Sequence, residues 1–159
     1  MAKLDRTDLL ILKSLQKNSK FNITELCEEV NMSKTPVYER IKRLEEDGFI
    51  KQYVALVDHK KVGLPLVIFC NVSLNVHNAE HIERFTNEIL KLDEVTECYS
   101  LGGVFDFLLK FVLEDLDAYN KFVFEKLTRI QDIVKMQSSI VLQEIKHTTQ
   151  LNLKLPEKS

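Results

Sequence analysis

The spacing of apolar residues changes between residues 48 and 66 of this 159-residue chain, and that change limits the possible folds more than any other feature. Up to residue 48 apolar side chains recur every three or four positions, as on one face of a helix. From residue 66 they alternate, as in a half-buried β-strand. A polar segment closing with Gly63 and Pro65 separates the two patterns, which is typical of a joint between domains. We therefore expect a helical domain over 1–50, a wing or linker strand over 51–64, and a second domain over 65–159.

The helical part predicts three short helices. The first covers 4–17, where Asp5 and Asp8 in the first turns suit the positive end of the helix dipole. The second covers Thr24–Val30 and can be capped by Asn22 or by Thr24 itself. The third has Ser33 at its N-cap and Gly48 just past its end.

The third helix buries one face and leaves a basic face exposed. Val37, Ile41 and Leu44 repeat at core-facing spacing. Residues 34–43 hold four basic side chains and one acidic side chain. Three short helices in this order are how a helix-turn-helix presents its recognition helix to DNA, although a lone charged helix face is more often simply solvated.

The outward side chains of this helix are the candidate DNA contacts. Thr24, at the start of the second helix, is a candidate phosphate contact, with a role as plain N-cap left open. Net charge is only −2, which predicts a small focused basic patch and not a broad phosphate-coating surface. The predicted DNA-binding residues are Thr24, Ser33, Lys34, Thr35, Tyr38, Arg40, Lys42 and Arg43.

The second half alternates strands and helices in the order strand-helix-strand, repeated once. Strands are expected over 66–76, 95–101, 105–113 and 139–145, helices over 78–91 and 116–130, and a possible fifth strand over 151–155. This order predicts a ferredoxin-like βαββαβ domain, an antiparallel four-stranded sheet with both helices on one face, and hence an α+β protein overall. Several apolar residues fall on the other face, which favours a dimer through the sheets: Val67, Phe69, Val104, Leu108 and Val112.

Three motifs resemble those of the Lrp/AsnC family of bacterial and archaeal transcription regulators. The segment Leu4–Gln16 matches the family's opening Leu-Asp-x-x-Asp-x-x-Ile-Leu-x-x-Leu-Gln. The segment Ser33–Ile50 matches its recognition helix, Ser-x-x-x-Val-x-x-Arg-Ile-x-x-Leu-Glu-x-x-Gly-x-Ile. The segment Gly103–Leu109 matches the Gly-x-x-Asp-x-x-Leu of its regulatory domain. The resemblance spans roughly 2–155 and implies a sequence-specific DNA-binding transcription regulator.

The resemblance also implies a small amino-acid effector, bound at the Gly103 loop between dimers of an octamer. The implied effector-binding residues are Gly103, Val104, Phe105, Asp106, Met136 and Ser138. Met136 stands where relatives often carry small hydroxyls, which mildly favours an apolar amino acid such as Leu or Met. Some alternatives stay open. Asp106 can serve turn geometry or assembly, and it is equally possible that no effector binds. The whole protein can also be an effector-independent DNA-organising protein or an amino-acid-sensing enzyme subunit.

Enzymatic, metal and membrane patterns are missing from the sequence. It has no nucleophile elbow, phosphate loop or dinucleotide fingerprint, so we expect no enzyme and no cofactor. His77 and His81 are four apart, but His77 is expected to end a strand, so no metal site is predicted. No apolar run is long enough to span a membrane. Cys27, Cys70 and Cys98 are isolated among apolar residues, as reduced thiols of a cytoplasmic protein would be.

Overall fold

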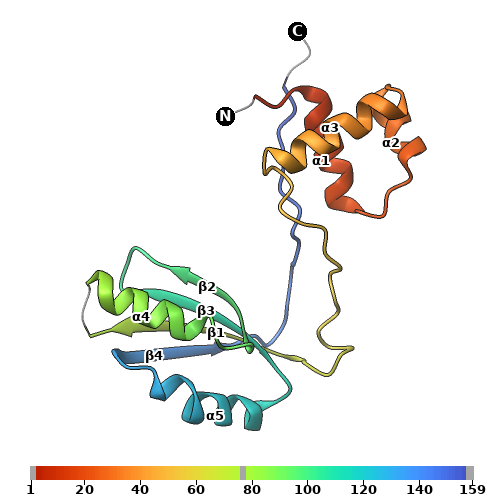
Figure 1. Cartoon of the computed structure of the whole chain (residues 1–159). Helices are drawn as coiled ribbons and strands as arrows, with labels where there is room; N and C mark the ends of the chain where they lie inside the picture. The colour runs from red at the N-terminus through yellow and green to blue at the C-terminus, as the bar shows by residue number, and fades with distance from the viewer. Residues whose placement is uncertain (1–2, 76–77, 157–159) are drawn as a thin grey trace. The chain divides into compact units, whose positions relative to one another are not determined.

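The computed structural model describes residues 3–75 and 78–156 (Figure 1). The chain folds into two compact units, which are described separately. One contains Met1–Leu56 together with Lys146–Ser159, and the other contains Val57–Ile145. The expected domain boundary at residue 65 lies near this division. The C-terminal segment belongs with the helices of the first unit.

The first unit contains the three predicted helices, α1 (Arg6–Lys17), α2 (Ile23–Val30) and α3 (Lys34–Glu46). Asp5 caps α1 by accepting a hydrogen bond from the amide of Asp8, whose carboxylate accepts one from the amide of Asp5 in return. Asn22 caps α2 through the amide of Thr24, so the alternative of Thr24 as N-cap is wrong. Both helices therefore begin where a short polar side chain satisfies a free N–H.

The helices pack around one hydrophobic core. Ile11 of α1 and Leu26 of α2 are buried with the predicted α3 stripe of Val37, Ile41 and Leu44. Beyond α3 the chain adopts the predicted C-terminal cap. Gly48 has φ +75°, and the amide of Phe49 reaches back to the carbonyl of Leu44 at 2.9 Å.

Two predicted strands are absent from the part of the chain that the structure describes. Residues 51–64, expected as a wing or linker strand, contain no strand, and neither do residues 151–155. The latter segment instead contacts α1: Leu151 donates its amide to Gln16 Oε1 at 2.6 Å, and Arg6 donates to the carbonyl of Pro156 at 3.2 Å. Alternating apolar residues favour an extended backbone, but a strand also needs a neighbour to pair with.

The second unit is the predicted ferredoxin-like domain. It contains, in chain order, β1 (Leu66–Leu74), α4 (Ala79–Ile89), β2 (Val95–Ser100), β3 (Phe107–Leu113), α5 (Leu116–Glu125), a 3₁₀ turn (Leu127–Arg129) and β4 (Ile133–Ile140). The antiparallel strands lie in the order β2-β3-β1-β4. The expected strand end at Val76, and His77, lie outside the described residues.

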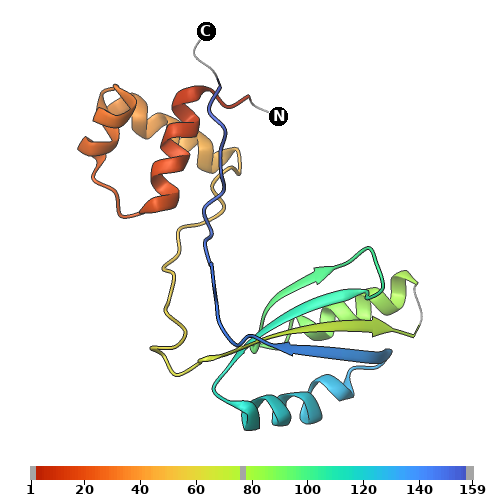
Figure 2. The ribbon, with the colours of Figure 1, turned by 180° about the vertical axis from the view of Figure 1, so that it is seen from behind.

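Both helices cover the same face of this sheet. Phe85 of α4 and Phe122 of α5 pack with Val72, Leu109 and Phe111, which point from β1 and β3 to that side. In Figure 2 the strands lie in front of α4, so the face that α4 leaves uncovered is visible. The domain therefore has one core, on the helix-covered face of the sheet.

The fourth strand lies earlier than predicted. It covers Ile133–Ile140, not 139–145, and pairs with β1 from Ile68 opposite Ile140 to Leu74 opposite Ile133. Its position at the sheet edge leaves most of its side chains exposed. The strand therefore lacks the apolar alternation by which a half-buried strand is recognised.

The uncovered face is only partly apolar. Val67 is buried, and Phe69, Leu108 and Val112 are half-buried. Lys110 lies opposite Phe69 and forms an ion pair with Glu97 at 2.7 Å. The sequence predicts Val104 on this face, but that residue lies outside the strands, in the loop 101–106 between β2 and β3.

Candidate nucleic-acid interface and ligand loop

The N-terminal half of α3 presents its polar side chains to solvent. Lys34, Thr35 and Tyr38 are exposed, and 55% of the Tyr38 surface is accessible. Ser33 occupies the N-cap position, but its hydroxyl makes no capping hydrogen bond within the described chain. The first turns of α3 thus offer hydroxyl, phenol and ammonium groups to an external partner.

The two arginines of α3 lie in a different environment. Arg40 binds the carboxylates of Asp5 at 2.6 Å and Asp8 at 2.7 Å, and Arg43 binds Asp8 at 2.6 Å. Asp8 is the buried partner, with 1% of its side chain accessible. The sequence predicts Arg40 and Arg43 as DNA contacts, but the structure places both guanidinium groups on α1, where they hold α3 against it.

Electrostatic effects at this cluster match its geometry. Partial burial alone would raise the pKa of Asp5, but the amide of Asp8 and the guanidinium of Arg40 outweigh it and hold that pKa below its ordinary value. The hydrogen bond to Asp5 in turn raises the pKa of Arg40. Both shifts stabilise the charged forms, so the cluster is an ion-pair network within the helical unit.

The remaining predicted DNA contacts are exposed. Lys42 lies 3.6 Å from Glu46 in an exposed pair one turn apart, a type of contact that contributes little to stability. Thr24 is exposed in the first turn of α2. Both side chains can therefore turn toward an external partner.

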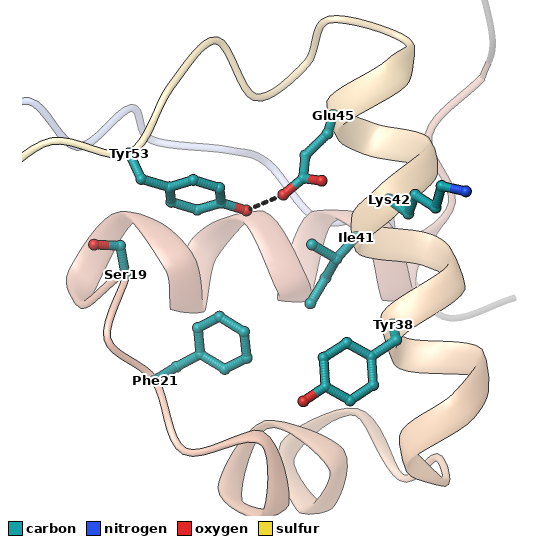
Figure 3. A pocket seen from close by; sticks show the side chains of 7 residues that line it. All are labelled: Ser19, Phe21, Tyr38, Ile41, Lys42, Glu45 and Tyr53. Atoms are coloured by element: carbon teal, nitrogen blue, oxygen red, sulfur yellow. Dashed lines mark hydrogen bonds between the residues drawn. The ribbon is translucent and has the colours of Figure 1, made fainter.

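A pocket of about 450 Å³ lies beside α3 (Figure 3). Phe21 from the α1–α2 loop, Tyr38 and Ile41 from α3, and Tyr53 from the segment after α3 line it. The Tyr53 hydroxyl donates a hydrogen bond of 2.7 Å to Glu45 Oε1. Burial and this hydrogen bond raise the pKa of Tyr53 to about 12. Sequence reasoning missed this pocket, because its walls come from three separate segments.

The loop 101–106 is tied to the end of β1 through Asp106. The Asp106 carboxylate accepts a hydrogen bond from the amide of Leu74 at 2.8 Å, and its own amide donates to the carbonyl of Val72 at 2.9 Å. Its carbonyl accepts from the amide of Leu101 at 2.7 Å. Asp106 therefore fixes the geometry of the turn, which is one of the two roles that the sequence left open.

The tip of the loop is open. A Cβ atom added at Gly103 would meet nothing within 4 Å, and Val104 is 88% exposed. The Phe105 ring lies 5.2 Å from the ammonium of Lys135. Nothing in the described chain packs against this tip closely enough to require glycine.

Met136 and Ser138 do not share a face with Phe105. Met136 packs against the core on the helix-covered side, and Ser138 accepts a hydrogen bond of 2.7 Å from the hydroxyl of Tyr119 on α5. Lys135, which contacts Phe105, precedes Met136 and therefore points to the opposite side of the sheet. Within a single chain, Met136 and Ser138 therefore do not face the loop as the opposite wall of the ligand pocket that the resemblance implies.

Comparison with known proteins identifies both units. Residues 4–51 match a winged helix-turn-helix DNA-binding domain, and residues 67–151 match the Lrp/AsnC ligand binding domain. The leucine-responsive regulatory proteins of Klebsiella pneumoniae and Escherichia coli are each 36% identical over 151 residues, covering 95% of this chain and 92% of theirs. The chain belongs to the Lrp/AsnC family.

Solved structures of Lrp/AsnC proteins have the same fold. A transcriptional regulator of Neisseria meningitidis, solved in complex with L-methionine, is 39% identical with a TM-score of 0.89 and covers 94% of this chain and 96% of its own. An AsnC-family regulator of Agrobacterium tumefaciens is 35% identical with a TM-score of 0.88, covering 93% and 96%. This Lrp/AsnC chain is thus a DNA-binding transcription regulator with a ligand-binding domain.

Neither a membrane helix nor a metal-ligand cluster occurs in the described part of this Lrp/AsnC chain. No helix within 3–75 and 78–156 is both long and apolar enough to cross a membrane. Within the same ranges no three His, Cys, Asp or Glu side chains are grouped as metal ligands would be.

Sequence reasoning missed the ion pairs that Asp5 and Asp8 form with α3. The helix dipole accounts for their early position in α1, yet both also bind the recognition helix. The only signal for this was the family motif Leu-Asp-x-x-Asp, which places the two carboxylates one turn apart on α1 and so allows both to face one neighbour.

Proposed function

We propose that this regulator reads double-stranded DNA with the N-terminal half of α3, and that Arg40 and Arg43 support that helix without reading bases. The observation that carries the proposal is the division of polar groups along α3. Lys34, Thr35 and Tyr38 are exposed, whereas both guanidinium groups bind α1 carboxylates. Helix-turn-helix proteins contact base edges mainly with the first residues of the recognition helix, which is where the exposed groups lie.

In this arrangement Ser33 and Thr35 supply hydroxyls, and Lys34 and Lys42 supply phosphate contacts on either side of Tyr38. Thr24 adds a phosphate contact at the start of α2. A patch this small gives weak binding per protomer, so several copies on one DNA are needed for useful affinity. Binding to chromosomal DNA in a bacterium or archaeon would place the protein in the cytoplasm.

We infer a small apolar amino acid, such as leucine or methionine, as the effector. The Neisseria relative was solved with L-methionine, and this chain matches the ligand binding domain of the family. The open backbone at Gly103, with Val104 and Phe105 beside it, can contact such a ligand, while Asp106 holds the loop in place. Because Met136 and Ser138 lie on the other side of the sheet, a second chain must supply the opposite wall.

The same observations support assembly of several chains. The half-buried residues Phe69, Leu108 and Val112 on the uncovered sheet face support a homodimer. Further association of dimers through the 101–106 loops, toward an octamer, would bring a second chain to each ligand site. An effector bound there would change assembly and thereby the number of recognition helices on one DNA.

One pair of measurements tests this function. Fluorescence anisotropy at about 150 mM salt compares a DNA fragment from upstream of the protein's own gene with random DNA of equal length. We expect binding to the former to be at least about 1,000-fold tighter. Equal affinity for both would overturn sequence-specific recognition and favour a DNA-organising protein. Thermal-shift assays with the twenty amino acids then test the effector, since a ligand that binds only the folded protein raises its melting temperature.

A further inference from the structure

The pocket beside α3 is walled by aromatic rings. Figure 3 shows Phe21, Tyr38 and Tyr53 around one space, with Ile41 projecting toward it from α3 between Tyr38 and Glu45. About half of each tyrosine surface is accessible, so both rings can contact a ligand. Aromatic rings grouped in this way attract organic cations, because the faces of their π systems are negative.

A carboxylate lies at the edge of the same space. Glu45 stands one turn after Ile41 on α3, and its Oε1 accepts the hydrogen bond from Tyr53 (Figure 3). That bond joins the carboxylate to one of the aromatic walls. The pocket therefore combines ring faces with a fixed negative group, the two features that favour a positively charged ligand.

The charges of the residues that line the pocket argue against a free amino acid as its ligand. Lys42 is the single cationic side chain among the residues that line this pocket, and its amino group points away from the space (Figure 3). It lies 3.6 Å from Glu46 on the outer surface of α3. A free amino acid would have its carboxylate unpaired in this pocket, whereas a cation without a carboxylate would leave no charge unpaired.

We propose that this pocket is a second ligand site, separate from the amino-acid site, that binds a small alkylammonium compound. The cationic nitrogen lies among the three rings near Glu45, and the alkyl part packs on Ile41. A volume of about 450 Å³ is ample for a compound the size of choline and lies in the range of ordinary ligand pockets.

Binding at this site bears on DNA recognition, a consequence that rests on the proposed DNA face. Tyr38 is both a wall of the pocket and a candidate base contact, so a ligand that holds its ring changes what α3 can present. We expect the alkylammonium compound to weaken DNA binding. The ligand site itself can be tested without DNA, so its failure is distinguishable from failure of the proposed function.

The test uses choline chloride as the probe and the full-length protein in its native assembly. Saturation-transfer-difference NMR on the N-methyl protons of choline reports binding, with sodium chloride used to hold ionic strength constant. Dimethylbutanol, which replaces the nitrogen of choline by carbon, is the neutral control of equal shape. We expect choline to bind with a dissociation constant on the order of 1 mM. Dimethylbutanol should bind at least about fivefold more weakly.

Two substitutions and a matched control locate the site. Glu45→Gln removes the charge but keeps the shape, and should weaken choline binding about fivefold while leaving dimethylbutanol unchanged. Phe21→Leu removes one ring and should weaken choline by a few-fold. Glu39→Gln, on the exposed face of α3 away from the pocket, should change nothing. Equal binding of choline and dimethylbutanol, no saturation transfer to choline, or equal losses in Glu39→Gln and Glu45→Gln would overturn the proposal.

Discussion

The recognition helix α3 and the loop 101–106 both carry a family motif, and in both the charged residue of the motif binds its own chain. Arg40 binds Asp5 and Asp8, and Asp106 binds the amide of Leu74. What remains exposed differs. The helix still offers Lys34, Thr35 and Tyr38, whereas the loop offers backbone and Val104. In the proposed function, a single chain therefore presents a DNA-reading face but only part of a ligand site.

The strongest test of the supporting role of the arginines is Asp8→Asn. This change removes the carboxylate that Arg40 and Arg43 share, while Arg40 keeps Asp5, and the loss of these charged hydrogen bonds should cost about 1.5–3 kcal/mol of unfolding free energy. Urea unfolding of the full chain, followed by circular dichroism, measures the loss. Asp47→Asn, an exposed change at the end of α3, is the control. A loss below about 0.5 kcal/mol would show that the cluster does not hold the helices together.

Tyr38→Ala tests the reading half of the same helix. The ring is 55% exposed, so its removal should leave the melting temperature unchanged. Loss of a base contact should weaken specific DNA binding by about 1–3 kcal/mol, or roughly fivefold to 150-fold. Anisotropy with specific and random DNA measures both affinities. An equal loss on both would reassign Tyr38 from base reading to backbone contact.

Two substitutions in the loop separate its supporting residue from its open tip. Asp106→Ala removes the acceptor for the Leu74 amide and should cost about 1–2 kcal/mol of unfolding free energy. Gly103→Ala adds a Cβ atom that meets nothing within 4 Å, so stability should change by less than about 0.5 kcal/mol. If the loop backbone contacts the effector, Gly103→Ala should still reduce the amino-acid-induced thermal shift. An unchanged shift would place the ligand elsewhere.

The smallest expected effect is the pH dependence that Asp5 contributes. Its pKa is lowered in the folded chain, so its stabilising contribution is complete above its unfolded pKa of about 3.9 and is lost as pH falls through the folded value. Because Asp5 is half-exposed, the contribution stays below about 1 kcal/mol. Asp5→Asn keeps an N-cap side chain but removes the charge. Melting temperatures between about pH 6 and pH 3 should therefore fall less in Asp5→Asn than in the native chain. Parallel curves would contradict the assignment.

Local features of the sequence were sufficient to predict much of the fold. The apolar stripe of α3, its N-cap at Ser33 and its end at Gly48 depend on neighbouring residues, and the structure contains all three. The order of strands and helices in the second domain could likewise be predicted from the spacing of its apolar residues. Edge strand β4 was misplaced because most of its side chains are exposed, which removes the apolar alternation.

Tertiary pairing could not be predicted in this way. Nothing local to Arg40 shows that its partners are Asp5 and Asp8, which lie more than thirty positions earlier. Apolar residues alternate in the segments near Tyr53 and Leu151, as they do in strands. In the structure, however, these residues donate hydrogen bonds to the side chains of Glu45 and Gln16, and the segments pair with no neighbouring strand. Candidate site residues chosen by charge therefore need the fold before they can be divided into binding and supporting groups.

The division of α3 can be measured most directly by comparing Lys34→Gln with Arg43→Gln. Both remove one positive charge from the same helix, so a uniform basic face would make them equivalent. DNA affinity is measured over a series of salt concentrations, together with the melting temperature of each variant. We predict that Lys34→Gln lowers the salt dependence of DNA binding by about one unit per protomer with an unchanged melting temperature. Arg43→Gln should instead lower the melting temperature and leave the salt dependence nearly unchanged. The opposite pattern, with Arg43→Gln reducing the salt dependence at constant melting temperature, would contradict the separation of reading and supporting residues.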